Sequence, residues 1–404
     1  MPGFLTDVAP TPTTWDALGA VTAHLETPFA VVDLGALRAN LDAMVTSAAG
    51  KPIRLATKSV RCREVARGVL SEPGFNGVLA LTLAEALWLA PDVSDVVVGY
   101  PTTDRESLLR LADDETLAAR VTLMVDSPEQ LDFIESVVGS AGPPLRICLD
   151  VDASLRLLGG RVHLGTRRSP LHDPAATVAL ARDVLDRPKF ALVGLMAYEA
   201  QIAGIGDDSG SRLHKAQIRT MQSMSGRELR DRRAAVVAAV REIATLEFVN
   251  GGGTGSIAAT ASESAVTEIA AGSGLYCPTL FDGYRRLSLH PAAFFVTSVV
   301  RRPSAEFATV LGGGWVASGA SGTDRLPTPV WPDGLELTAL EGAGEAQTPL
   351  RGVGVGSLQA GDRVWFRHAK AGELCERVNT LHLVSGDRLL ASVPTYRGEG
   401  HAFL

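Results

Sequence analysis

The chain has 404 residues, of which 46% are hydrophobic and 21% are charged, so it can bury a large core and form two domains. Its formal net charge of −7, with no block of Lys and Arg, argues against a surface that follows the phosphates of a nucleic acid. The N-terminal residues lack a basic stretch followed by an apolar one, and no apolar segment reaches the roughly 18 residues that cross a bilayer. We therefore expect a cytoplasmic protein without nucleic-acid or membrane partners.

An early strand, Phe29–Asp33, is followed by a helix with apolar residues at helical spacing. From residue 53 to residue 270, short β-branched segments then alternate with amphipathic helical segments, which is typical of a parallel α/β sheet. The expected strands are Ile53–Thr57, Gly77–Leu81, Asp95–Gly99, Val121–Val125, Leu145–Val151, Ala191–Ala197, Leu246–Asn250 and Val266–Ala270. Eight strands with intervening helices predict a closed (β/α)₈ barrel, and Phe29–Asp33 is expected outside it.

The segment Gly204–Arg232 predicts a loop followed by a polar helix. After about residue 285 the helical period fades, and short strands separated by Gly, Pro and Asp predict a mostly antiparallel β domain. These strands are Phe294–Arg301, Phe307–Gly312, Gly352–Val355, Arg363–His368, Thr380–Val384 and Leu389–Val393. We expect a barrel domain over residues 28–284, and a β domain over residues 285–404 together with residues 1–27.

Lys58 ends the first predicted barrel strand, and strand ends are where barrel enzymes carry their chemistry. Most lysines are solvated charges, but a lysine at this place suggests an amine that forms an imine. Cys62, Cys148, Cys277 and Cys375 are scattered without a C-x-x-C pair, so reduced thiols are expected and no disulfide framework is indicated.

Two glycine turns, Phe248–Ser256 and Ile269–Tyr276, follow the last two predicted barrel strands. Glycine lets backbone N–H groups approach an anion, and Thr254, Ser256 and Ser273 can add hydroxyl donors, so both turns suggest phosphate cradles. Because the eighth strand of a closed barrel lies beside the first, Lys58 and the glycine turns would face one barrel mouth.

Four ordered segments carry a family resemblance: Thr27–Leu34, the strand that ends in Lys58, Asn250–Gly255 and Ala271–Tyr276. Together they resemble the alanine-racemase-fold enzymes that use pyridoxal 5′-phosphate (PLP), specifically the branch of D-threonine aldolase and D-serine dehydratase. The resemblance spans most of the chain. It implies that Lys58 is the catalytic lysine that binds PLP covalently. The residues that it implies around the cofactor phosphate are Gly252, Gly253, Thr254, Gly255, Gly274 and Tyr276.

The resemblance also implies that Tyr198, which follows the sixth barrel strand, lies close to the cofactor, although a wall tyrosine bonded to backbone is an alternative. For the residue at the pyridine nitrogen, the segment Asp150–Gly165 offers Arg156, Arg161 and His163, of which His163 aligns best. That choice stays open. Ala56 stands where family members usually carry a histidine.

A candidate metal site comes from the same resemblance, since this branch carries a His-x-Asp or His-x-Cys pair late in the chain. His368 and Cys375 are the candidates here, with Asn379 four residues beyond Cys375 as in the family. Their spacing is longer than in the family, so Glu373 is an alternative ligand, and a surface histidine with a buried thiol is the simpler reading. Imidazole and thiolate favour Zn²⁺ over Mn²⁺ or Mg²⁺.

The resemblance implies a lyase that depends on PLP and a divalent metal and cleaves β-hydroxy-D-amino acids into glycine and an aldehyde. A D-serine dehydratase is the alternative. A racemase would need a second base, for which Tyr284 and Tyr396 are candidates, and a non-catalytic PLP carrier is disfavoured by the extra β domain. The oligomeric state stays open, with a homodimer among the options.

Overall fold

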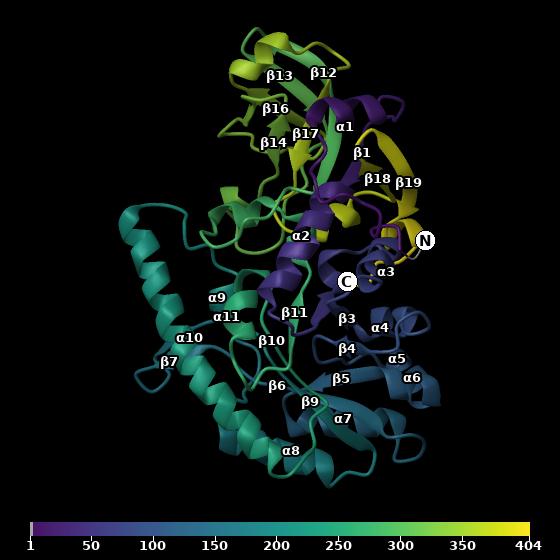
Figure 1. Cartoon of the computed structure of the whole chain (residues 1–404), viewed down its shortest axis with the longest axis vertical. Helices are drawn as coiled ribbons and strands as arrows, with labels where there is room; N and C mark the ends of the chain where they lie inside the picture. Colours follow the sequence, from purple (N-terminus) through teal and green to yellow (C-terminus); the bar gives the residue numbers. More distant parts are fainter. Residues whose placement is uncertain (1–2) are drawn as a thin grey trace. The chain divides into compact units, whose positions relative to one another are not determined.

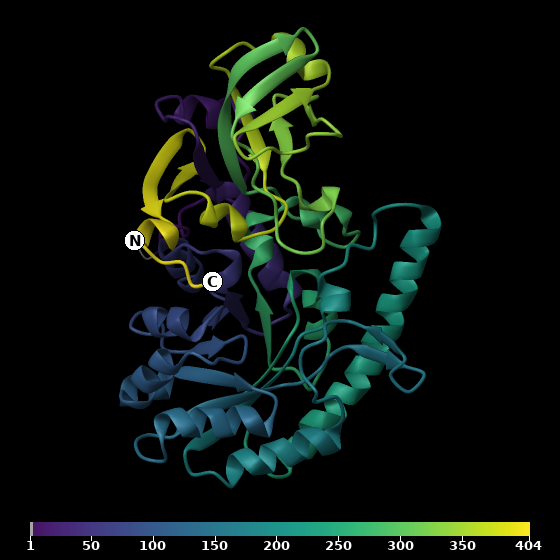
Figure 2. The same cartoon turned by 180° about the vertical axis from the view of Figure 1, so that it is seen from behind.

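The computed structural model describes residues 3–404, and the chain divides into two compact units (Figures 1 and 2). We call them the barrel unit, made of Met44–Lys58, Pro73–Gly272 and Phe403–Leu404, and the sheet unit, made of Met1–Ala43, Ser59–Glu72 and Ser273–Ala402. The domain boundaries expected from the sequence stay a prediction.

The barrel unit holds a closed barrel of parallel strands in the order β10-β11-β2-β3-β4-β5-β6-β9. The strands are β2 (Ile53–Ala56), β3 (Phe75–Ala80), β4 (Val96–Val98), β5 (Val121–Val125), β6 (Leu145–Asp150), β9 (Phe190–Ala197), β10 (Phe248–Gly251) and β11 (Glu268–Ala271). The barrel closes between β11 and β2, where Ile269 pairs with Ile53. The predicted (β/α)₈ barrel is confirmed, with every strand within two residues of its expected bounds.

The helices of the chain are α1 (Trp15–Val21), α2 (Leu34–Ser47), α3 (Arg63–Leu70), α4 (Leu83–Leu89), α5 (Arg105–Ala112), α6 (Glu115–Arg120), α7 (Pro128–Val138), α8 (Pro174–Leu185), α9 (Ala200–Ala203), α10 (Arg212–Arg241), α11 (Ile257–Ala261) and α12 (Ser273–Tyr276). Local sequence sets where several begin. The Thr82 hydroxyl accepts from the Glu85 N–H at the start of α4, and Asp173 accepts from the Ala176 N–H at the start of α8. Inside the barrel an apolar cluster includes Val97, Met124, Cys148, Val193, Met196 and Phe248.

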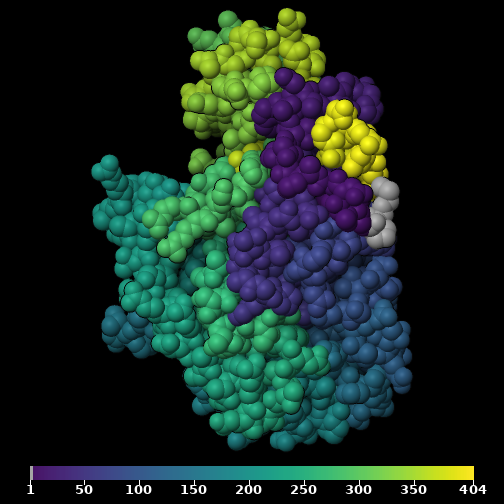
Figure 3. All heavy atoms as spheres, in the orientation of Figure 1, coloured from purple at the N-terminus to yellow at the C-terminus, as the bar shows by residue number. Residues whose placement is uncertain are grey.

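The long helix α10 confirms the predicted loop and polar helix. Its buried apolar residues, among them Leu229, Val236 and Val240, lie in its C-terminal half, and the helix packs against α8. Its N-terminal half projects from the barrel and forms a separate ridge in the space-filling view (Figures 1 and 3). No helix within residues 3–404 is both long enough and apolar enough to cross a membrane.

The sheet unit is built on one sheet in the order β15-β16-β13-β12-β1-β18-β19, with β17 pairing β12 and β14. Its strands are β1 (Phe29–Asp33), β12 (Ala293–Ser304), β13 (Phe307–Leu311), β14 (Thr328–Trp331), β15 (Glu336–Leu337), β16 (Gln347–Arg351), β17 (Arg363–Arg367), β18 (Thr380–Ser385) and β19 (Arg388–Pro394). The early strand therefore lies outside the barrel, as predicted. The sheet is mostly antiparallel, and the pairing of β1 with β18 is parallel.

Two local predictions were wrong or incomplete. The expected strand Gly352–Val355 belongs largely to a 3₁₀ turn, Val353–Ser357, because Gly352 has a φ of 112° that ends the ladder of β16. The strand of this region, β16, lies just before that turn. Pro349 within β16 obscured the strand pattern in the sequence. Sequence reasoning also missed the short hairpin of β7 (Leu155–Leu157) and β8 (Val162–Leu164) in the barrel unit.

Candidate active site

Lys58 follows β2 in a 3₁₀ turn and is exposed at the C-terminal end of the barrel. The Thr57 hydroxyl donates to the Leu79 carbonyl at 3.1 Å and so ties this turn to the neighbouring strand β3. Lys58 Nζ donates to Tyr100 Oη at 3.0 Å and lies 5.6 Å from the centroid of that ring. The predicted lysine therefore lies at the barrel mouth, where barrel enzymes carry catalytic groups.

Tyr100 is a residue of the mouth that sequence reasoning missed, although it directly follows the predicted strand that became β4. Burial raises the pKa of Tyr100, but the Lys58 ammonium, its hydrogen bond and the Arg168 guanidinium together bring this pKa below its ordinary value. The Lys58–Tyr100 pair can therefore hold and exchange a proton more readily than an isolated tyrosine could.

Arg168 is the second residue that was missed, because it lies in the irregular segment after the β7–β8 hairpin. Its guanidinium carbon lies 5.4 Å from the Tyr100 ring centroid and 5.8 Å from that of Tyr198. Such stacking holds the guanidinium plane while leaving its N–H groups available. Arg168 makes no ion pair with any carboxylate of residues 3–404, so the mouth contains a cation suited to an anionic ligand group.

Asp150 ends β6 beside β9, where it pairs with Met196. Burial, followed by the nearby Asp126 carboxylate, raises the pKa of Asp150 to about 7, while Arg168 opposes this rise. The mouth therefore includes a carboxyl group that can change its protonation state near neutral pH.

The glycine turn after β10 fits an anion cradle, because Gly252 and Gly253 cannot carry a side chain without conflict. Gly252 has a φ of 85°, and a Cβ there would lie 2.9 Å from Ile269 Cγ2. A Cβ on Gly253 would lie 2.9 Å from Ala203 Cβ and 3.1 Å from the Tyr198 ring. Tyr198 thus lies against the glycine turn, and the structure brings these two predicted cofactor residues together. Burial raises the pKa of Tyr198 to about 12, and the charge of the adjacent Glu199 carboxylate contributes to this rise.

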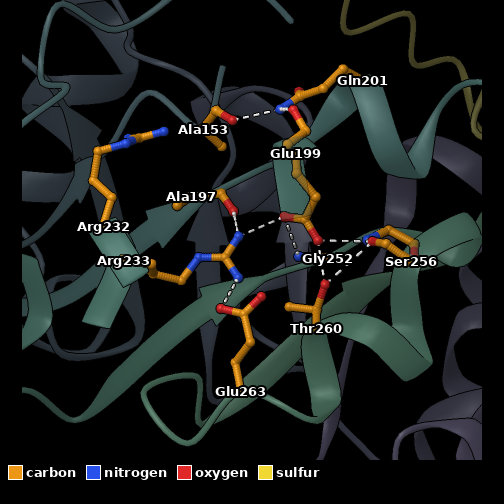
Figure 4. Close-up of polar contacts among 12 residues, drawn as sticks. Ala153, Ala197, Glu199, Gln201, Arg232, Arg233, Gly252, Ser256, Thr260 and Glu263 are labelled. Atoms are coloured by element: carbon orange, nitrogen blue, oxygen red, sulfur yellow. Dashed lines mark hydrogen bonds and ion pairs between the residues drawn. The ribbon is translucent and has the colours of Figure 1, made fainter. Parts of the chain in front are cut away.

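Behind the turn lies a buried carboxylate that sequence reasoning did not single out (Figure 4). Glu199 accepts hydrogen bonds from Ser256 Oγ at 2.8 Å and the Gly252 N–H at 3.2 Å, and also from the Thr260 hydroxyl. Arg233 Nη2 pairs with it at 2.8 Å. Burial raises the pKa of Glu199, but Arg233 and the two hydroxyl donors outweigh it and hold this pKa below its ordinary value.

The three candidates for the pyridine nitrogen all lie in or beside the β7–β8 hairpin. His163 Nε2 bonds with the Thr166 carbonyl at 2.9 Å, Arg156 Nε bonds with Asp152 at 3.0 Å, and Arg161 is exposed. Arg156 and His163 pair with each other across the hairpin. These contacts do not connect His163 to Lys58 or Tyr198, so its role stays a prediction.

The remaining predicted site residues lie in the sheet unit. Gly274 and Tyr276 are buried in α12. The Tyr276 hydroxyl donates to the Val60 carbonyl at 3.2 Å, and the Cys375 thiol donates to the same carbonyl, also at 3.2 Å. The Tyr276 ring meets the His368 ring edge-on, with centroids 6.4 Å apart. The structure therefore brings both predicted metal ligands, His368 and Cys375, into contact with Tyr276 or its hydrogen-bond acceptor.

His368 is 2% exposed, and neither of its ring nitrogens has a hydrogen-bond partner within residues 3–404. Burial and the adjacent Arg367 lower the pKa of His368 to about 3, and the Ala293 backbone opposes this without meeting hydrogen-bond geometry. A neutral imidazole with orphaned nitrogens suits a metal ligand, because a buried polar atom needs a partner.

Cys375 and Glu373, the other candidate metal ligands, fit a metal site less well than His368 does. Burial raises the pKa of the Cys375 thiol well above its ordinary value. Glu373, the alternative ligand, accepts from the Ser318 N–H at 2.9 Å. Within residues 3–404 no group of three or more His, Cys, Asp or Glu residues lies close enough together to hold a metal. A metal held by His368 and Cys375 therefore stays a prediction.

A parallel barrel with a lysine after its first strand and a glycine turn after its seventh, joined to an antiparallel sheet, is the architecture of the alanine-racemase-fold PLP enzymes. The chain belongs to this family, since residues 32–279 match the model of the alanine racemase N-terminal domain.

Within this family, the chain is similar to aldolases and dehydratases that are named for D-amino acids. A D-threonine aldolase from Arthrobacter sp is 26% identical over 300 residues, covering 71% of each chain. The structure of D-threonine aldolase from Filomicrobium marinum aligns with a TM-score of 0.74 at 22% identity, covering 92% of this chain and 95% of that one. D-threo-3-hydroxyaspartate dehydratase from Delftia sp. HT23 aligns with a TM-score of 0.72 at 18% identity, covering 93% and 98%. A cysteine-to-alanine mutant of a D-threo-3-hydroxyaspartate dehydratase, with a TM-score of 0.73, was solved in a metal-free form.

Proposed function

We propose that this protein is a PLP-dependent lyase that cleaves β-hydroxy-D-amino acids into glycine and an aldehyde, in the manner of a D-threonine aldolase. The observation that carries the proposal is the pairing of Lys58 with Tyr100 at a barrel mouth that also holds the glycine turn. The D-threonine aldolase from Arthrobacter sp, similar over 71% of the chain, supports the choice of reaction.

When bound, PLP supplies an electron sink for a bond that breaks at the substrate Cα. Lys58 holds the cofactor covalently, and the glycine turn receives its phosphate. Tyr100 holds the Lys58 amine in place through its hydrogen bond and exchanges a proton with it. Arg168, stacked between two tyrosines, orients an anionic group such as the substrate carboxylate.

The proposed metal ligands are His368 and Cys375, with Zn²⁺ preferred over Mn²⁺ or Mg²⁺ because the donors are imidazole and thiolate. A divalent metal held there would supply a Lewis acid for the substrate β-hydroxyl. The orphaned nitrogens of His368 support this proposal. So does the metal-free form of the dehydratase mutant that lacks a cysteine. A cytoplasmic location and a homodimer remain predictions.

Dehydration is the second candidate reaction, and Cys375 is the observation that favours it, because dehydratases of this branch pair a histidine with a cysteine. Cleavage of the Cα–Cβ bond removes the proton of the β-hydroxyl and returns a proton to Cα, whereas dehydration removes the Cα proton and expels the β-oxygen as water or hydroxide, so it requires a base placed over the Cα proton. This difference and the curated relative favour the aldolase.

Incubation with D-threonine, D-serine and D-threo-3-hydroxyaspartate tests the proposal. We expect glycine and an aldehyde, and no reaction with L-threonine as the control. Ammonia and a keto acid without glycine would establish the dehydratase. Racemised substrate with neither set of products would overturn both lyase readings.

A further inference from the structure

The glycine turn after β10 presents its backbone N–H groups to two different partners. The Gly252 N–H donates to Glu199, and the Gly253 N–H donates to Ser256 Oγ at 3.1 Å. The Ser256 hydroxyl in turn donates a hydrogen bond to Glu199. Two amides and one hydroxyl that a phosphate could otherwise engage are therefore already occupied from inside the protein.

The Gly255 amide remains available to an external anion. Its N–H forms no hydrogen bond within the described residues 3–404, and the residue is only half-buried. Glu199 thus acts as an internal anion on one side of the turn and leaves the other side for a ligand.

A carboxylate this close to an anion cradle would repel a phosphate unless its charge were balanced. Arg233 provides that balance from α10 (Figure 4). Its two terminal nitrogens bond with Glu199 and Glu263, each at 2.8 Å, and one also donates to the Ala197 carbonyl at 3.0 Å. Ala197 ends β9, so the arginine ties the carboxylate to the end of a barrel strand.

Glu263 differs from Glu199 in one respect that makes it a matched control. Both carboxylates bond with Arg233, but only Glu199 contacts the turn through Gly252 and Ser256. A change at Glu263 therefore alters the charge balance of the arginine without altering the partners of the turn.

We propose that Glu199 is a positioning residue that fixes the conformation of the glycine turn and thereby sets its affinity for the cofactor phosphate. The inference rests on the proposed function, since it takes PLP as the ligand. The proposed effect of Glu199 on the cofactor is indirect, because the groups that it contacts belong to the protein. It acts through Gly252 and Ser256, whose contacts decide which N–H groups face outward.

The test compares Glu199→Gln with Glu263→Gln by PLP titration and by ³¹P NMR of the bound phosphate. A glutamine keeps the shape, but its NH₂ group donates and cannot accept, so one of the two acceptor oxygens of Glu199 is lost. We expect the PLP dissociation constant of Glu199→Gln to rise by about tenfold or more, with a changed ³¹P shift. Glu263→Gln should stay within about twofold of the wild type. If Glu199→Gln does not fold, Ser256→Ala probes the same contact without changing the charge, and it should also weaken PLP binding.

Wild-type affinity and ³¹P shift in both Glu199→Gln and Ser256→Ala would overturn the inference. Equal weakening in Glu199→Gln and Glu263→Gln would also overturn it, because the effect would then belong to the charge of Arg233. A wild-type protein that binds no PLP at all would refute the proposed function itself, which is a different result from equal PLP binding by the wild type and Glu199→Gln.

Discussion

At the scale of single residues, the side chains of the barrel mouth contact one another and change one another's charge environment. Lys58, Tyr100 and Arg168 form a cationic and aromatic group, and Arg168 continues it to Tyr198. Lys58 could be predicted from the sequence because it ends a β-branched strand. Arg168 could not, since only the folded path of an irregular segment brings it between two tyrosine rings.

The first prediction concerns Lys58. The purified protein loaded with PLP should be yellow, and borohydride should fix the cofactor to Lys58 by reducing the covalent link. Lys58→Ala should lose the covalent chromophore and nearly all lyase activity. Lys215→Ala, which removes a lysine of α10 that pairs with Asp208, should keep both. Absorbance spectra and peptide mass analysis measure this. A wild type that stays colourless with added PLP would contradict it.

The second prediction concerns Asp150. Its folded pKa is raised to about 7 from an ordinary value of 3.8, so between these pH values the folded protein holds a proton that the unfolded chain has released. The resulting stabilisation is fully present below the unfolded pKa and is lost as the pH rises through 7. In protein freed of cofactor, Asp150→Asn should therefore gain stability relative to the wild type between pH 4 and pH 8, by at most about 4 kcal/mol.

Thermal unfolding of both proteins at the two pH values measures this difference. The wild type and Asp150→Asn should differ least at the acidic end. A constant difference across the range would mean that Asp150 titrates as an ordinary aspartate in the folded protein.

At the scale of elements, the alternation of strands and helices predicted the barrel, because parallel strands buried on both faces read as continuous apolar segments. β5, for example, is buried at all five positions. The β7–β8 hairpin could not be predicted in this way, since each strand has three residues and carries polar side chains. Glu199 was missed for a related reason. Its partners Gly252, Ser256 and Arg233 come from distant segments, so no local spacing marks it.

The third prediction concerns the glycine turn as an element. Gly253→Asp should weaken PLP affinity by about tenfold or more, because a Cβ would press on Tyr198 and Ala203 and a carboxylate would repel the phosphate. Gly226→Asp on α10 is the matched control, since a Cβ there meets only Ile202 Cδ1 at an ordinary 3.7 Å. Both variants should fold, which circular dichroism can check. Equal PLP titrations would show that Gly253 only turns the chain.

At the scale of the whole molecule, the proposed PLP residues come from both units of the chain. Lys58 and the glycine turn after β10 belong to the barrel unit, whereas Gly274 and Tyr276 belong to the sheet unit. The proposed metal ligands His368 and Cys375 belong to the sheet unit as well. Only these two residues are proposed to act at the substrate β-hydroxyl, so changes at them should lower lyase activity without changing cofactor binding.

The last prediction tests this separation. Chelation should abolish lyase activity and Zn²⁺ or Mn²⁺ should restore it, while the PLP spectrum stays unchanged, because the proposed ligands act on the substrate rather than on the cofactor. His368→Ala and Cys375→Ala should each lower activity by about tenfold to a hundredfold. Cys277→Ala removes another buried thiol of the same unit and should leave activity intact. Full activity in Cys375→Ala would remove that residue from the site and direct attention to Glu373. Full activity after metal removal would show that the lyase reaction does not depend on a metal bound by His368.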